Sequence, residues 1–197
     1  MTQQTTDLLV NSSDEIASRD DEQPTRQAVA SPDGSESPLR QNQPKYVPAQ
    51  AGVVYWGPGN RMKFVLTGKE TAGAFFLSEI SVPPGGGPPP HVHSREDESF
   101  HILEGTLTIQ VGKDTITASP GDLAFLPRGI VHSFKNTGDA TAKALVLITP
   151  AGLENYFAEV FDPDEDRSSA PPPPSKAMLA RAMSAAPRYG LELLPPA

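Results

Sequence analysis

Two stretches of the chain decide its fold. Residues 85–105 read GGGPPPHVHSREDESFHILEG, and residues 121–136 read GDLAFLPRGIVHSFKN. Each begins with turn-forming Gly or Pro residues and continues into a short run in which polar and apolar side chains alternate. Such alternation is typical of a strand with one buried face. The two stretches therefore predict short antiparallel strands joined by tight turns.

Similar runs continue on both sides of these stretches, between Tyr46 and Pro150. Turns that contain Gly and Pro separate the runs. We expect strands over Val53–Trp56, Arg61–Thr67, Ala74–Val82, Glu98–Val111, Asp114–Ala118, Leu123–Leu126, His132–Asn136 and Ala142–Thr149. Many short strands in succession favour an antiparallel sandwich or barrel over a parallel α/β sheet. Residues 46–150 are therefore expected to form one all-β domain.

The pattern changes after this domain. Residues 151–197 are expected to form a C-terminal helical extension that contains a Pro-rich linker. Apolar residues at helical spacing predict one helix within Leu153–Phe161 and a second over Lys176–Ala186. The acidic and proline-rich segment Asp162–Pro174 is expected to be a stiff, exposed linker between them. The last apolar group, Tyr189–Leu194, is expected to pack back onto the domain.

The composition narrows the classes of partner. The chain has 197 residues, a formal net charge of -8 and no cysteine, which excludes disulfides and thiolate sites. An acidic balance without a basic stripe disfavours nucleic acid. Without a bilayer-length apolar run or a signal-peptide pattern, we expect a cytoplasmic protein with no membrane partner. Residues 1–45 lack aromatic residues and are more acidic than basic, which predicts a disordered acidic tail.

Side chains of the metal-ligand type converge in the two stretches. Residues two apart on a strand point to the same face, so His91 and His93 are expected to lie side by side. Glu98 would begin the return strand, and His132 lies on another strand. Three imidazoles and a carboxylate inside an apolar barrel suit a divalent transition metal, and they would be costly to bury uncompensated. A His-x-His pair alone is more often a surface feature, so Glu98 and His132 carry the prediction.

The same alternation predicts the surroundings of the site. We expect a substrate pocket lined by residues that share a strand face with the ligands, namely Phe100, Ile102 and Phe134. His101 falls on the opposite face from Glu98 and is expected to be structural or exposed. Glu96 and Asp97 are expected to lie in a solvated turn. An apolar pocket without an inward Lys or Arg disfavours sugar phosphates, which need cationic or amide clamps.

The two stretches resemble the signature motifs of the cupin superfamily. The first motif reads Gly, five residues, His-x-His, four residues, Glu, six residues, Gly; the second reads Gly, five residues, Pro-x-Gly, two residues, His, three residues, Asn. The chain matches both at every fixed position. The resemblance implies a double-stranded β-helix, the cupin jelly-roll barrel. It also implies one divalent transition metal held by His91, His93, Glu98 and His132, with iron, nickel, cobalt, manganese and copper all open.

Within this superfamily, the chain looks like the quercetin 2,3-dioxygenase-type monocupins. The likeness rests on the single barrel, the three prolines before His91 and the segment Pro150–Phe157. It implies a metal-dependent dioxygenase that opens a flavonol-like aromatic or enolic substrate, with Glu98 also acting as the catalytic base. The expected partners are this small molecule and dioxygen, and a homodimer is a fair expectation because small cupin barrels often pair. A non-catalytic, small-molecule-binding or regulatory cupin and a metal-dependent isomerase or cyclase stay open as alternatives.

Overall fold

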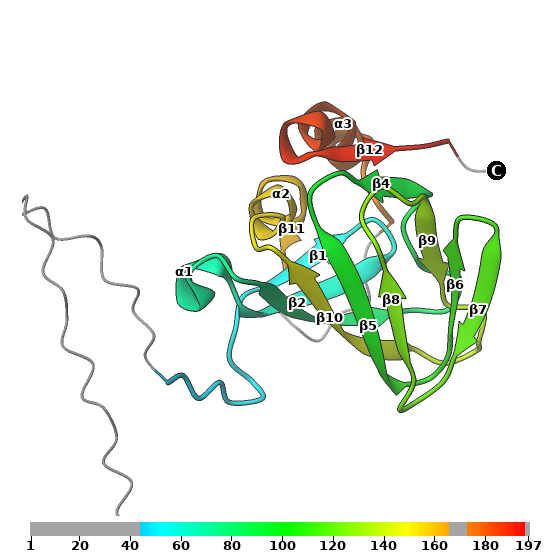
Figure 1. The fold of residues 1–197 in the computed structure, drawn as a ribbon, viewed down its shortest axis with the longest axis horizontal. Coiled ribbons are helices and arrows are strands. Elements are labelled where there is room, and N and C mark those ends of the chain that lie inside the picture. Colours follow the sequence, from blue (N-terminus) through cyan, green and yellow to red (C-terminus); the bar gives the residue numbers. More distant parts are fainter. Residues whose placement is uncertain (1–43, 166–172, 196–197) are drawn as a thin grey trace, which may run out of the picture. The chain divides into compact units, whose positions relative to one another are not determined.

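The computed structural model describes residues 44–165 and 173–195. The segment expected to be a disordered acidic tail therefore lies almost entirely outside the described residues, as does part of the expected linker. In the described part, two antiparallel sheets face each other, with helices at one end of the barrel (Figure 1). This is the expected all-β jelly-roll architecture with C-terminal helices.

The larger sheet has seven strands. In spatial order they are β11 (Asp162–Pro163), β1 (Val54–Gly57), β2 (Asn60–Leu66), β3 (Phe76–Val82), β10 (Ala142–Thr149), β5 (Asp97–Glu104) and β8 (Leu123–Leu126). The five-stranded sheet has the order β12 (Leu191–Leu193), β4 (His91–His93), β9 (His132–Lys135), β6 (Leu107–Val111) and β7 (Asp114–Ala118). The helices are α1 (Gly68–Thr71), α2 (Glu154–Val160), α3 (Lys176–Ala185) and the 3₁₀ helix η1 (Ala186–Tyr189).

The core lies between the two sheets and follows the alternation of the strands. Strands β3 and β10 bury every second residue, and β5 does the same as far as Ile102. The buried side chains are mainly β-branched and aromatic, and they include Phe76, Ile80, Phe100, Ile109 and Ile148. Because side chains two apart share a face, one alternating sequence supplies both the core and an outer surface. This register also fixes which polar residues point inward.

Two differences from the expected strands matter for the site. The run predicted as one strand over Glu98–Val111 is two strands, β5 and β6, because the chain turns at Gly105 with φ of 67°. A Cβ atom there would lie only 2.8 Å from the Cα of Ala142, so glycine suits both the turn and the close approach. The final apolar group also does more than pack back, since it forms strand β12 and pairs with β4.

The expected linker after α2 is partly ordered against the barrel. Asp162–Pro163 form β11 and pair with β1, and the buried carboxylate of Asp164 lies 2.6 Å from the Arg61 guanidinium. Asp162 and Pro163 are exposed as expected, although they form a strand, and the expectation of an exposed linker is wrong for Asp164. An arginine on β2 and the free edge of β1 provide partners that the linker sequence does not reveal by itself.

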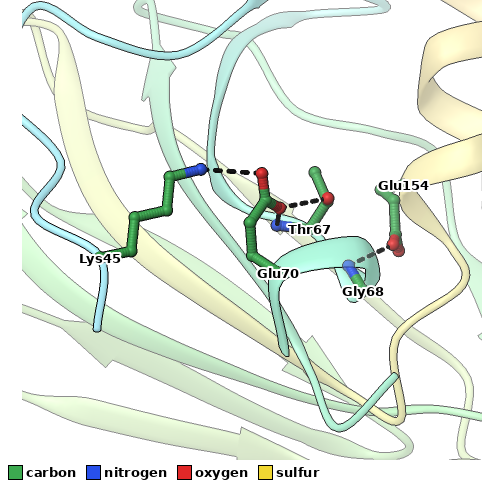
Figure 2. Close-up of polar contacts among 5 residues, drawn as sticks. All are labelled: Lys45, Thr67, Gly68, Glu70 and Glu154. Carbon is green, nitrogen blue, oxygen red and sulfur yellow. Dashed lines mark hydrogen bonds and ion pairs between the residues drawn. The ribbon is translucent and has the colours of Figure 1, made fainter. Parts of the chain in front are cut away.

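A buried carboxylate fastens α2 to the body of the barrel. The side chain of Glu154 accepts hydrogen bonds from the backbone N–H of Gly68, at 2.7 Å, and of Gly152, at 2.6 Å. Figure 2 shows the first of these bonds beside the start of α1. There Glu70 closes a capping box with Thr67 and receives a 2.7 Å contact from Lys45. The Glu154 side chain thus links the start of α2 to the start of α1, although the two helices are far apart in the sequence.

The C-terminal elements gather where β4 lies. Figure 1 shows α2, α3 and β12 at the same end of the barrel as β4. The Ser175 hydroxyl accepts the Met178 N–H at 3.0 Å and so begins α3 with an N-cap, as sequence patterns of this kind predict. Arg181 on α3 donates to the Val160 carbonyl and thereby ties α3 to the end of α2. In the part of the chain described, no helix is long and apolar enough to span a membrane.

Candidate metal site

The two sheets bring four ligand-type side chains together. His91 and His93 lie on β4, and His132 lies directly opposite His91 on the neighbouring strand β9. Glu98 comes from β5 in the other sheet. All four side chains are buried, and they form the predicted set of three imidazoles and one carboxylate. Strand alternation and register place the three histidines together, and the packing of the two sheets brings Glu98 to them.

The spacing of the four side chains fits a single ion. Their ligand atoms all lie within 4.8 Å of one another. Two donors that bind a transition metal at about 2.0–2.2 Å lie no more than about 4.4 Å apart, even when they are on opposite sides of it. An inward shift of roughly half an ångström would therefore let all four reach one ion. The cluster could hold a metal ion, and its nitrogen-rich donor set suits a transition metal.

Backbone carbonyls orient two of the imidazoles. The Nδ1–H of His91 donates to the Pro89 carbonyl at 2.9 Å, and the Nδ1–H of His132 donates to the Ile130 carbonyl at 3.0 Å. When Nδ1 carries the proton, Nε2 offers its lone pair. Such outer hydrogen bonds fix the tautomer of metal-binding histidines. The residue two positions before each histidine therefore sets how its ring faces the cluster.

Several buried atoms of the cluster lack hydrogen bonds within the described part of the chain. They are Nδ1 of His93, Oε2 of Glu98 and Nε2 of His132. The last two lie 3.2 Å apart without hydrogen-bond geometry, and they form a contact of opposite charges only when His132 is protonated. Buried polar atoms are nearly always satisfied in folded proteins. Their grouping at one point is therefore the observation that fits a bound cation.

The electrostatics of the cluster set its charge. Burial, together with the neighbouring imidazoles, lowers the pKa of His91 to about 4, and burial also lowers the pKa of His93. Burial alone would raise the pKa of Glu98, but the imidazoles outweigh it and hold that pKa below its usual value. Glu98 in turn raises the pKa of His132 against the effect of burial. The cluster thus keeps two neutral imidazoles and an ionised carboxylate near neutral pH.

A cavity of about 580 Å³ opens beside the cluster. Its volume lies within the range of about 300–1,000 Å³ that is usual for small-molecule sites. His91, His93 and Glu98 reach it on one side, together with Asn60 and Met62 of β2; we call this side the barrel wall. The other side, the C-terminal wall, consists of side chains from α2, α3 and β12, among them Tyr156, Phe157, Phe161, Leu179, Met183 and Leu191.

The three predicted pocket residues occupy different places. Phe134 lines the cavity, whereas Phe100 and Ile102 are almost fully buried and do not belong to its lining. Phe100 stacks edge-on against Phe134, with ring centroids 5.1 Å apart. Strand parity identified the correct face for all three. It did not show how deep each residue lies, and Phe100 and Ile102 belong to the core and not to the cavity lining.

The neighbours of Glu98 divide between the two faces. Asp97 accepts hydrogen bonds from the backbone and guanidinium of Arg128 on the outside, which lower its pKa to about 2. Glu96 is buried, and burial raises its pKa, so its expected place in a solvated turn is wrong. The two-residue alternation of β5 continues one step before the strand and places Glu96 on the side of Glu98. His101 is half-buried on the opposite face, as expected.

Sequence reasoning missed most of the cavity's second side. Leu153–Phe161 was expected to form a helix, and helical spacing gave no sign that its aromatic residues line a cavity. The pairing of β12 with β4 brings the C-terminal residues to the site, and the sequence between them is about a hundred residues long.

Comparisons with known proteins agree with this geometry. A family model described as cupin domain matches residues 78–148, which span β3 to β10 and contain all four clustered ligands. The chain contains a cupin domain. The solved structure of KdgF from Halomonas sp. has a similar fold, with a TM-score of 0.51, 17% identity, and coverage of 57% of this chain and 99% of that one. A likeness at this identity concerns the fold alone.

Two curated proteins show the relationship in sequence. A germin-like protein, subfamily 2 member 1, from Arabidopsis thaliana is 35% identical over 56% of this chain and 51% of its own length. Quercetin 2,3-dioxygenase from Bacillus subtilis is 30% identical over 57% of this chain and 35% of its own length. The chain thus spans about half or less of these relatives. The cupin domain here is a distant homologue of both.

Proposed function

We propose that this cupin is a metal-dependent dioxygenase that acts on a flavonol-like aromatic or enolic substrate. The observation that carries the proposal is the buried His91, His93, Glu98 and His132 cluster, three members of which open directly into a largely apolar cavity. The similarity to a protein named quercetin 2,3-dioxygenase supports the same substrate class. The substrate and dioxygen are the two small-molecule partners that the proposal requires.

In the proposed reaction, the bound metal and the Glu98 carboxylate would have different roles. A divalent transition metal held there supplies Lewis acidity and redox access to dioxygen. Glu98 is the only carboxylate among the described lining residues, and its lowered pKa keeps it ionised at neutral pH. It can therefore accept the proton of an enolic hydroxyl as the substrate binds. Both oxygen atoms would enter the cleaved product, and carbon monoxide would leave.

The walls of the cavity favour a flat and uncharged ligand. Among the described lining residues there is no lysine or arginine, and most contribute only carbon to the surface. Phe134, Phe157 and Phe161 provide aromatic faces or edges. Such walls bind an apolar aromatic body and keep bulk water from the reacting atoms, which strengthens electrostatic interactions within the site.

Oxygen uptake tests the proposal. Protein loaded separately with iron, nickel, cobalt, manganese or copper is mixed with quercetin, and dissolved oxygen and released carbon monoxide are both measured. We expect equal amounts of oxygen consumed and carbon monoxide released with at least one metal, and neither with metal-free protein. Binding of quercetin without oxygen uptake by any metal form would contradict the proposal and support the non-catalytic alternative.

A further inference from the structure

The cavity is not uniformly apolar. Away from the four clustered ligands, the lining consists mainly of Pro, Met, Leu, Ala and Phe side chains. Two polar side chains interrupt it, Asn60 on the barrel wall and Tyr156 on the C-terminal wall. They come from β2 and α2, which belong to separate parts of the sequence. Two polar groups in such a setting call for a partner.

Asn60 is held in place by the backbone around it. It is the first residue of β2 and pairs with Gly57 across the turn from β1. Its side chain is only 5% exposed and lines the cavity. Within the described residues, the amide makes no hydrogen bond. The amide is therefore available to a ligand or to water in the cavity.

Tyr156 is a second polar side chain that lines the cavity, on the C-terminal wall. The residue is 5% exposed, and its ring packs against Phe157 and Tyr189 at centroid distances of 5.6 and 5.8 Å. Its hydroxyl makes no hydrogen bond to any residue that the structure describes. Burial raises the pKa of Tyr156 to about 12, so the hydroxyl keeps its proton at neutral pH. Glu154, two residues earlier, anchors this part of α2 to the barrel.

We propose that Asn60 and Tyr156 form a recognition pair that hydrogen-bonds a hydroxyl or carbonyl group of the substrate, separate from the oxygen atoms that face the metal cluster. The inference rests on the proposed function and names the substrate more narrowly, as a neutral aromatic compound with a further oxygen-bearing group besides those that face the cluster. An amide and a phenol both donate and accept hydrogen bonds. The pair therefore suits an uncharged hydroxyl or carbonyl better than a carboxylate or phosphate, which would need a cation.

Two related compounds separate the roles of cluster and pair. Quercetin and 3-hydroxyflavone share the hydroxyl and carbonyl that would face the cluster, but 3-hydroxyflavone lacks the other hydroxyls. Their affinities are measured by calorimetric titration of metal-loaded protein under argon, so that no turnover is needed. We expect Tyr156→Phe and Asn60→Leu each to weaken quercetin binding by about two- to ten-fold, as the loss of one hydrogen bond predicts. The affinity for 3-hydroxyflavone should stay unchanged.

Tyr189→Phe is the matched control. The Tyr189 hydroxyl donates to Glu159 at 2.8 Å and lies outside the cavity lining, so its removal should leave both affinities unchanged. Metal content and melting temperature are measured for each variant to show that the fold is intact. Unchanged quercetin affinity in either variant, or equal weakening for both compounds, would overturn the pair. Wild-type binding without oxygen uptake would contradict the dioxygenase and leave the pair supported.

Discussion

The two walls of the cavity differ in how the chain builds them. The barrel wall includes residues of β2, β4, β5 and β9, and backbone carbonyls orient the His91 and His132 imidazoles of the cluster. The C-terminal wall consists of α2, α3 and β12, and its side chains there are almost all apolar. On α3, Leu179 and Met183 remain largely exposed although they line the cavity. The barrel wall carries the polar ligand groups, and the C-terminal wall is almost entirely apolar and partly exposed.

This difference separates two tasks. The barrel wall holds the groups that could bind a metal and accept a proton, whereas the C-terminal wall decides which molecules fit above them. Substitutions on the barrel wall should therefore remove chemistry, and substitutions on the C-terminal wall should alter ligand affinity and stability. The experiments below test this separation, starting with the largest expected effect.

Removal of two imidazoles should abolish metal binding by the cluster. In His91→Ala/His93→Ala, one carboxylate and one imidazole remain, which cannot retain an ion against dialysis. We expect about one metal ion per wild-type chain after supplementation and close to none in the variant, measured by elemental analysis. His101→Ala is the control, because His101 lies on the other face of β5. Equal metal content in all three proteins would show that the cluster is not the metal site.

Replacement of Glu98 by glutamine should separate binding from proton transfer. An amide can still coordinate a metal weakly, but it is a very poor base near neutral pH. With metal in excess, turnover of Glu98→Gln should remain lower by roughly a hundred- to ten-thousand-fold. Asp97→Asn should stay near wild type, since Asp97 faces Arg128 outside the cavity. Full recovery of the metal-saturated Glu98→Gln enzyme would remove the base role and leave only a ligand role.

Truncation of Leu191 should weaken the C-terminal wall and the strand beside it. Leu191 is buried, lines the cavity and pairs opposite His93. Leu191→Ala should lower the free energy of unfolding by about 2–5 kcal/mol, as for other buried leucines. Leu123→Ala on the edge strand β8 should change it little, because Leu123 is 66% exposed. Urea denaturation of both variants measures the contrast, and equal losses would contradict it.

Removal of the Glu154 carboxylate should loosen α2 without touching the cluster. Glu154→Ala leaves the N–H groups of Gly68 and Gly152 without their acceptor. We expect a loss of about 1–3 kcal/mol in the free energy of unfolding, with metal content unchanged. Glu192→Ala, an exposed position on β12, serves as the control. A loss of metal in Glu154→Ala would show that the two walls are not independent.

The smallest expected effect is a pH-dependent change in stability that arises from Glu70, a residue outside both walls. Lys45 and Thr67 lower the pKa of Glu70 from 4.5 to about 2 (Figure 2). The ionised form is therefore favoured in the folded state, so its contribution is complete above pH 4.5 and is lost as the pH falls toward 2. Glu70→Gln should lower the melting temperature by no more than about 3 °C at pH 7, because the group is solvent-screened. The difference from wild type should shrink below pH 4.5.

The barrel wall could be predicted because its information is local. The spacing of His91, His93 and Glu98 places them on facing strands, and the second stretch adds His132. The fold class followed from the same short alternating runs. Glu96 was misplaced, because the sequence does not show that alternation continues through the turn before β5. The deeper places of Phe100 and Ile102 depend on packing between the sheets, which parity does not determine.

The C-terminal wall could not be predicted because it depends on contacts between distant segments. Nothing in the composition of Leu191–Leu193 indicates that β4 is its partner, since a three-residue strand has almost no register signal of its own. On the barrel wall the same holds for Asn60, whose place in the cavity lining no sequence pattern indicated. Such residues become visible when the sheet order is known.

The pairing of β12 with β4 has a consequence for synthesis. His91 and His93 leave the ribosome about a hundred residues before Leu191–Leu193, the strand that pairs along the whole length of β4. On its other side, β4 meets β9 in a ladder where His91 stands opposite His132. Contacts between distant segments form late, after the intervening chain has been made. Until Leu191–Leu193 has been made, β4 would therefore be paired on one side only, by β9, so His91 and His93 should reach their final positions only after β12 has joined the sheet.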